Sequence, residues 1–318
     1  MEADARMVRG AAGAEGRDGN CAMNMQSSSM PVVLTVAGSD SGAGAGIQAD
    51  IKTFEALGVG GVCAVTCVTA QTPGRVTGVE PVSCTLISEQ IDAVCRDFPV
   101  AVAKIGMLHS AAIVETVADC VERVRAPLWV LDPVMISTSG ARLLQHDAVE
   151  SLRERLLPAV DVVTPNIPEA EELWGHPVDS VEKMAVAARE IGRRHSVSCV
   201  VKGGHLCATS AALDGSPRVI ADALWDGSQV RFFKSPAVQA RETHGTGCTF
   251  SAALAAGLAR GEKLPQAARQ AQSFVAKALA YARPVGKHLP LGWARASVEL
   301  RLVNDVLDKQ QAPGPRHK

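Results

Sequence analysis

Chemistry-bearing residues are densest in the segment 244–249, which reads His-Gly-Thr-Gly-Cys-Thr and leads into an expected helix. Glycines at a helix start expose backbone N–H groups at the positive end of the helix dipole, and this arrangement binds anions. Cys248 falls in the first turn, a position that lowers the pKa of a thiol. An ordinary helix start with a buried cysteine is the alternative interpretation.

The segment 164–171 offers oxygen ligands. Asn166 and Glu169 are three residues apart at an expected helix start, so their side chains can share one face. Such oxygen atoms suit a hard cation that keeps several waters, as Mg²⁺ does. The alternative is that Asn166 caps the helix and Glu169 completes a capping box. Taken by themselves, these two residues favour the capping interpretation.

Two charged residues stand at the ends of expected strands. Asp132 follows the apolar run 128–131 and could hold Mg²⁺ through water or cap a turn. Lys202 precedes two glycines and could point at a phosphate group or remain solvated in a loop. The pattern alone does not separate these alternatives.

The glycine-rich segment 38–46 lies between an expected strand and an expected helix. It lacks the Gly-Lys-Ser/Thr of a phosphate-binding loop and does not match Gly-x-Gly-x-x-Gly in register. What remains is a turn in which the backbone can approach a ligand closely, or a turn that is purely structural.

A zinc site is the competing interpretation of four residues: His205, Cys207, His244 and Cys248. Their types are those of zinc ligands, but the short Cys-x-x-Cys spacing of a structural zinc site is missing. We therefore expect no zinc.

Apolar runs that alternate with helical patterns must position these residues. We expect strands at 31–37, 62–70, 101–105, 128–131, 161–164, 198–202, 218–225 and 229–233. We expect helices at 46–57, 88–98, 111–124, 147–157, 168–173, 181–193, 248–260 and 265–283. This alternation predicts a mostly parallel sheet covered on both faces, with the last two strands antiparallel at one edge. A ligand site is then expected at the carboxyl ends of the strands.

The composition narrows the class of protein. The 318 residues are 47% hydrophobic and 20% charged, which is typical of a globular chain. A net charge of −1 and an aromatic content of 3% argue against a nucleic-acid partner. No apolar run is long enough to cross a membrane. Nine cysteines without a Cys-x-x-Cys motif indicate a reducing compartment, so we expect a cytoplasmic protein.

Taken together and in this order, the motifs resemble those of the hydroxymethylpyrimidine/phosphomethylpyrimidine kinases, on the vitamin-kinase branch of the ribokinase superfamily. The resemblance is carried by Ala37-Gly38-Ser39-Asp40, residues 44–50, Asp132-Pro133-Val134-Met135, Thr164-Pro165-Asn166, residues 168–171, Lys202-Gly203-Gly204-His205 and residues 244–249. The chain departs from the family pattern at Ala43, where glycine is frequent, at Thr72-Pro73 after Gln71, and at Ala141.

The resemblance implies a ribokinase-like three-layer α/β sandwich over residues 30–290. The composition of residues 1–29, rich in Ala, Gly, Ser and Met, predicts a disordered leader that has no counterpart in the family, and residues 291–318 are expected to form a C-terminal helix and a frayed tail. It implies Mg²⁺- and ATP-dependent phosphorylation of 4-amino-5-hydroxymethyl-2-methylpyrimidine and then of its monophosphate, in thiamine biosynthesis. A pyridoxal/pyridoxine kinase is the alternative enzyme, and a ligand sensor without catalysis is the alternative from another class. A homodimer is expected.

The resemblance also implies roles for individual residues. Gly245, Thr246 and Gly247 would bind the transferring phosphoryl group, and Cys248 would be the catalytic base. Asn166 and Glu169 would organise Mg²⁺ with Asp132 nearby, while ATP would contact Asn166, Lys202 and Thr243. The pyrimidine pocket would be lined by Gly38, Ala45, Asp50, Gln71, Met107 and Val134.

Overall fold

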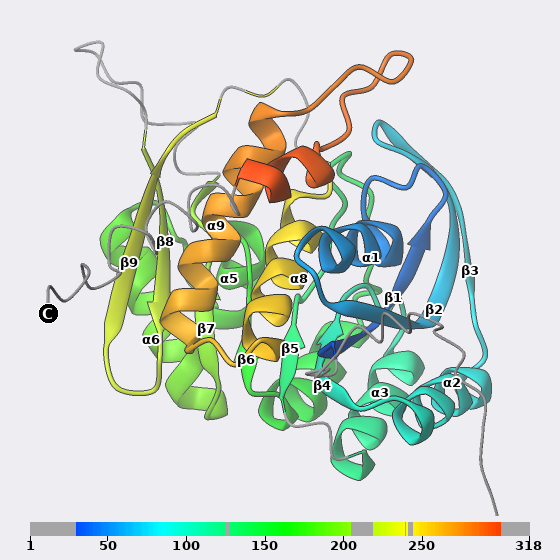
Figure 1. Cartoon of the computed structure of the whole chain (residues 1–318). Helices are drawn as coiled ribbons and strands as arrows, with labels where there is room; N and C mark the ends of the chain where they lie inside the picture. The colour runs from blue at the N-terminus through cyan, green and yellow to red at the C-terminus, as the bar shows by residue number, and fades with distance from the viewer. Residues whose placement is uncertain (1–29, 125–127, 205–218, 239, 241–243, 300–318) are drawn as a thin grey trace, which may run out of the picture.

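The computed structural model describes residues 30–124, 128–204, 219–238, 240 and 244–299. Its centre is a nine-stranded sheet in the order β3-β2-β1-β4-β5-β6-β7-β8-β9 (Figure 1). The strands are β1 Val32–Asp40, β2 Gly60–Thr72, β3 Arg75–Pro81, β4 Val100–Ile105, β5 Trp129–Leu131, β6 Val162–Val163, β7 Ser198–Val201, β8 Val219–Trp225 and β9 Val230–Pro236. The six strands from β2 to β7 are parallel, and β3, β8 and β9 pair antiparallel at the two edges.

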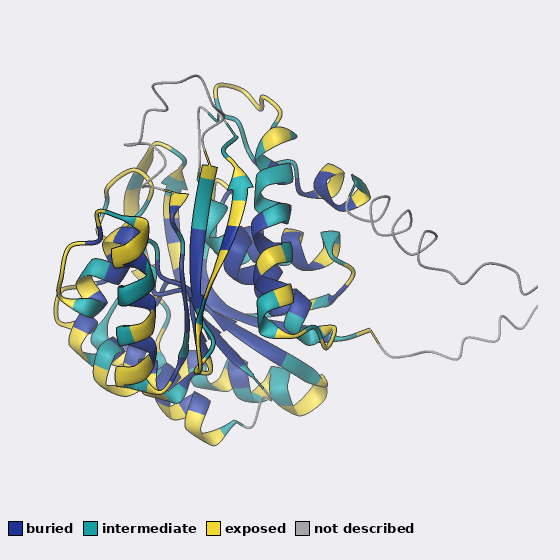
Figure 2. Ribbon diagram, turned by 90° about the vertical axis from the view of Figure 1, so that its left-hand side faces the viewer, coloured by how far each residue is buried: buried dark blue, intermediate teal, exposed yellow. Residues whose placement is uncertain are grey.

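Helices cover both faces of the sheet, so the molecule has three layers (Figure 2). One layer holds α1 Gly46–Ala56, α8 Thr246–Ala259 and α9 Leu264–Ala280. The other holds α2 Cys84–Asp97, α3 Ala111–Arg123, α4 Ala148–Ser151, α5 Ile167–Trp174 and α6 Val181–His195. Side chains alternate along β1, because Leu34 and Val36 pack with the second layer whereas Val33 packs with the first.

The parallel sheet, its two helical layers and the antiparallel β8–β9 edge confirm the expected architecture. Edge strand β3 was not expected, because most of its residues are exposed and it carries Gly78 and Glu80 in place of a continuous apolar run. Helix α2 begins earlier than Ser88, because Ser83 caps it by accepting a hydrogen bond from the Leu86 N–H.

The expected helix 147–157 is only partly α-helical. α4 continues as a π-helix over Leu152–Leu156 and a 3₁₀ turn over Leu157–Ala159. Near the C-terminus, residues 293–299 are helical. Among the described residues, no helix combines the length and the apolar character needed to cross a membrane.

Candidate active site

A cavity of about 790 Å³ opens where the parallel strands end. Its wall contains most of the residues that the sequence singled out: Gly38, Ala45, Gln71, Met107, Asp132, Val134, Asn166, Glu169, Lys202 and Gly245 to Cys248. Among the described residues, Asp50 was expected in this wall but does not line it; its side chain is completely buried. Thr243 falls outside the described residues.

The start of α8 is shaped by two glycines. Gly245 is the N-cap, with a φ of 82°, a left-handed conformation in which side chains are strained. A Cβ atom on Gly247 would lie 3.5 Å from Lys202 Nζ and 3.8 Å from Asp132 Oδ2. The first turn of α8 therefore faces both a cation and a carboxylate. We call Gly245, Thr246 and Gly247 the anion site.

Asp132 and Lys202 form a close ion pair beside the anion site. Lys202 Nζ lies 2.7 Å from Asp132 Oδ1, and Ser251 Oγ donates to Asp132 Oδ2 at 3.1 Å. Burial opposes ionisation of Asp132, but Lys202 and Lys104 together hold the pKa of its carboxyl below the usual value. The pair is therefore charged at neutral pH, and Lys202 Nζ lies next to Gly247 in the first turn of α8.

Asn166 and Glu169 form a capping box at the start of α5. The Glu169 N–H donates to Asn166 Oδ1 at 2.9 Å, and the Asn166 N–H donates to Glu169 Oε2 at 2.8 Å. Burial raises the pKa of Glu169 to about 7, although Lys202 opposes this rise. The structure therefore contains the capping box that was the alternative interpretation of these two residues. The carboxyl group of Glu169 also lines the cavity.

The described residues contain no group of three or more His, Cys, Asp or Glu side chains able to hold a metal ion. The carboxylates of Asp132 and Glu169 are two oxygen donors in the cavity wall. They fit a cation such as Mg²⁺, which takes only one or two ligands from the protein and the others from water and phosphate.

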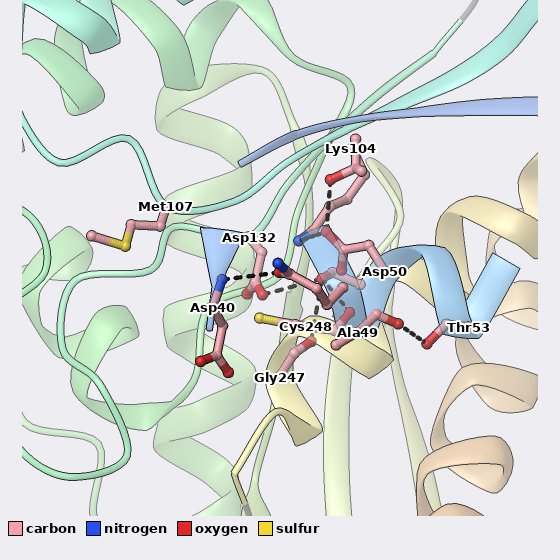
Figure 3. Close-up of polar contacts among 12 residues, drawn as sticks. Asp40, Ala49, Asp50, Thr53, Lys104, Met107, Asp132, Gly247 and Cys248 are labelled. Atoms are coloured by element: carbon pink, nitrogen blue, oxygen red, sulfur yellow. Dashed lines mark hydrogen bonds and ion pairs between the residues drawn. The ribbon is translucent and has the colours of Figure 1, made fainter. Parts of the chain in front are cut away.

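Asp50 does not line the pyrimidine side of the cavity, so this expectation is wrong. Its side chain points from α1 into the layer between helix and sheet, where it is completely buried. Lys104 Nζ lies 2.8 Å from Asp50 Oδ2, and Thr35 Oγ1 donates to the same oxygen at 2.6 Å (Figure 3). Lys104 itself borders the cavity, whereas Asp50 does not.

Sequence reasoning missed Lys104, although a signal was available. The residue stands inside the apolar strand β4, and a lysine in such a strand needs a buried partner of opposite charge. Asp40, quoted only as part of a motif, was missed as well, although it lies in the cavity wall and contacts His244.

Cys248 is half-buried, and its sulfur points toward the space between Asp40 and Asp132 (Figure 3). Burial raises the pKa of the thiol to about 11; Lys104 opposes this rise, and the carboxylates of Asp50 and Asp132 add to it. The direction is opposite to the expected lowering, because burial and two carboxylates act on this thiol. Cys248 is protonated at neutral pH.

Tight packing also shapes the acceptor side of the cavity. A Cβ atom on Gly38 would come within 2.7 Å of Cys67 Sγ and 3.2 Å of Met107 Sδ, so a larger residue there would have to displace these side chains. The side chain of Gln71 lies beside Thr69, whose hydroxyl oxygen is 3.2 Å from Gln71 Oε1 and 2.9 Å from the Ser39 carbonyl oxygen. This wall combines apolar surface with one amide.

Comparison with known sequences gives consistent results. Residues 40–291 match the family model described as phosphomethylpyrimidine kinase. The chain is 44% identical over 269 residues to the hydroxymethylpyrimidine/phosphomethylpyrimidine kinase of Haemophilus influenzae, covering 84% of this chain and 98% of that protein. It is 42% identical over 270 residues to a thiamine biosynthesis bifunctional protein of Geobacter sulfurreducens, and spans about half (53%) of that longer protein.

Solved structures agree with this assignment. The pyridoxal kinase of Staphylococcus aureus in complex with AMP-PCP and pyridoxal superposes with a TM-score of 0.73 at 31% identity, covering 84% of this chain and 94% of that one. The phosphomethylpyrimidine kinase of Clostridium difficile gives a TM-score of 0.66 at 36% identity, covering 77% of this chain and 97% of that one. The fold, the cavity and the sequence matches together show that this chain belongs to the phosphomethylpyrimidine kinase family.

Proposed function

We propose that this chain transfers the γ-phosphoryl group of ATP to the hydroxyl of a hydroxymethylpyrimidine and then to the resulting monophosphate. The observation that carries the proposal is one cavity that joins the anion site, the Lys202–Asp132 pair and the Gln71–Met107 wall. Catalysis of phosphoryl transfer rests mainly on positioning and on stabilisation of negative charge. The N–H groups of the anion site and Lys202 supply both.

We infer that ATP lies with its phosphates between Lys202 and the anion site, and with its base toward α9. On that side the cavity is bordered by Val275, Ala276 and Leu279, which offer an apolar surface to a flat ring. Asn166 and Thr243 are proposed as further ATP contacts. Asp132 and Glu169 would hold Mg²⁺, which when bound neutralises charge on the phosphate oxygens.

The acceptor ring would lie against Gly38, Ala45, Met107 and Val134, with the Gln71 amide hydrogen-bonding its polar edge. Cys248 then stands where the reacting hydroxyl meets the anion site. We propose that its thiolate form receives the hydroxyl proton and becomes the thiol; because burial raises the pKa of Cys248 to about 11, this role is directly testable through its pH dependence. Asp50 is no longer proposed as a substrate contact.

A pyridoxal kinase is the second candidate. The observation in its favour is the likeness to the Staphylococcus aureus pyridoxal kinase, which has a higher TM-score than the Clostridium difficile phosphomethylpyrimidine kinase. Both acceptors are flat heteroaromatic rings that carry a hydroxymethyl group, so the shape of the cavity admits either.

The deciding experiment measures ADP release with Mg²⁺ and ATP for three acceptors: hydroxymethylpyrimidine, its monophosphate and pyridoxal. We expect turnover with the first two and a much lower kcat/KM with pyridoxal. The Lys202→Met variant, purified in parallel, excludes a contaminating kinase. Turnover with pyridoxal alone would establish the second candidate, and turnover with none of the three would overturn both.

Other features remain predictions. We propose a kinase domain over residues 30–290 and a C-terminal helix that begins after it; the expected leader at 1–29 and the expected tail, from residue 300 on, lie outside the described residues. A homodimer, a cytoplasmic location and the lack of a nucleic-acid partner also stay predictions. Light scattering of the purified chain tests whether it is a homodimer.

A further inference from the structure

Two glycine-rich segments about 200 residues apart in the sequence meet at the cavity. We call residues 38–46 the acceptor loop; the other segment is His244 with the anion site. A Cβ atom on Gly245 would lie 1.8 Å from the Gly44 carbonyl oxygen, and one on Gly44 would lie 2.6 Å from His244 Cδ2. The two backbones are therefore in direct contact, with no room for side chains between them.

One carboxylate joins these segments. Asp40 Oδ2 accepts the N–H groups of Gly44 at 3.0 Å and Ala45 at 2.8 Å, and Oδ1 accepts that of Gly42 at 2.8 Å. His244 Nε2 lies 2.9 Å from the same Oδ2. Asp40 thus fixes the path of the acceptor loop and at the same time contacts the residue that precedes the anion site.

The Asp40–His244 contact is sheltered from solvent. The exposed fraction of the side chain is 3% for Asp40 and 9% for His244. Burial opposes ionisation of Asp40, but the hydrogen bonds from His244, Ala45 and Gly42 lower the pKa of its carboxyl below the usual value. A hydrogen bond to an ionised group that water cannot reach is stronger than an exposed one.

The two segments carry the two reacting partners. In the proposed function, Gly38 and Ala45 border the acceptor ring, while the anion site holds the transferred phosphoryl group. Phosphoryl transfer requires the attacking oxygen and the phosphorus to be aligned, and a misplacement of ~1 Å can cost ~10²-fold in rate. The contact between the two segments therefore sets a distance on which the rate depends.

We propose that His244 is a positioning residue, whose hydrogen bond to Asp40 holds the acceptor loop in register with the anion site. The inference rests on the proposed function, because it assigns the two segments to acceptor and phosphate. His244 acts through Asp40 and the backbone of Gly44, and its Nε2 atom is engaged by the carboxylate.

Two variants separate the hydrogen bond from the shape of the ring. His244→Phe keeps a flat ring against Gly44 but removes the donor, and His244→Gln keeps an N–H donor without the ring. We expect His244→Phe to lower kcat at least about tenfold for both phosphorylation steps, with both KM values within about twofold of the wild type. We expect His244→Gln to restore kcat to within about threefold. His176→Phe, at an exposed position beyond the end of α5, is the matched control and should leave all constants unchanged.

Binding of ADP alone, measured by calorimetry, should be the same in the wild type and in His244→Phe, because each half of the site remains intact. Asp40→Asn is a second test of the same contact, for the case that His244→Phe does not fold. It should show the same loss of kcat.

An unchanged kcat in His244→Phe would overturn the proposal. Equal losses in His244→Phe and His244→Gln, or a rise in the KM for ATP alone, would also overturn it, because the imidazole would then act on the nucleotide directly. A wild type without turnover on any pyrimidine would instead refute the proposed function, so the two failures are distinguishable.

Discussion

Replacement of Cys248 by alanine tests the chemistry of the first phosphorylation. The first acceptor is a neutral alcohol, which must lose its proton as it attacks, and a positioned base contributes about 10²–10⁴-fold to such a transfer. The second acceptor is a phosphate that already carries negative charge. We therefore expect Cys248→Ala to slow the first step by about 10²-fold or more and to affect the second step far less.

The raised pKa of the thiol adds a pH dependence with a definite sign. With a pKa of about 11, only about 3 in 10,000 of the Cys248 side chains are thiolate at pH 7.5. The thiolate fraction rises about tenfold with each pH unit as long as the pH stays below that pKa. If the thiolate is the base, kcat of the first step should increase about tenfold per unit from pH 6.5 to 9, and kcat of the second step should not.

The assay is ADP release at saturating ATP and Mg²⁺, with hydroxymethylpyrimidine or its monophosphate as the acceptor, across that pH range. Cys248→Ala should abolish the slope in the first step, and Gly247→Val should damage both steps because both use the anion site. A flat profile in the wild type, or equal losses in the two steps for Cys248→Ala, would refute the role of Cys248 as a base. Cys248 would then only shape the anion site.

Four further substitutions test other residues. Gln71→Leu should raise the KM for the pyrimidine by ~10-fold, because an unpaired polar edge costs roughly 1–3 kcal/mol; a higher KM for ATP alone would place Gln71 against the wrong ligand. Glu169→Gln should raise the Mg²⁺ concentration needed for half-maximal activity, and superimposable titrations would leave Glu169 as a capping residue only. Ala43 has a φ of 56°, so Ala43→Gly should stabilise the protein by ~0.5–1 kcal/mol in urea melts. Ala185→Gly, in the interior of α6, should destabilise it by ~1 kcal/mol because glycine is unfavourable inside a helix, and the same sign for both would refute the argument from strain.

The parts of the fold that the sequence could predict rest on local patterns. Each parallel strand is a short apolar run followed at once by a polar or glycine-rich segment, and this order places Asp132, Asn166 and Lys202 at one edge of the sheet. The capping box of Asn166 and Glu169 is also local, since its members are three residues apart. Such features need no knowledge of the remainder of the chain.

The parts that could not be predicted depend on partners far away in the sequence. Lys104 and Asp50 are 54 residues apart, and His244 and Asp40 are 204 residues apart. The error at Cys248 has the same origin. Its position at a helix start is visible in the sequence, whereas its burial and the carboxylates that surround it exist only after the sheet and both helical layers have assembled.

The buried charges around Cys248 are better explained by their effect on neighbouring ionisable groups than by a contribution to the stability of the fold. Lys104 and Asp50 are both completely buried, and an ion pair of this kind is often no more stabilising than apolar side chains of the same volume. Lys104 nevertheless favours the thiolate of Cys248, while Asp50 and Asp132 oppose it. The same lysine lowers the pKa of Asp132, which in turn keeps Lys202 charged beside the anion site. One buried cation thus acts both on the thiol of Cys248 and on the carboxylate of Asp132, the two groups to which the proposed function gives roles on the acceptor side and the phosphate side of the cavity.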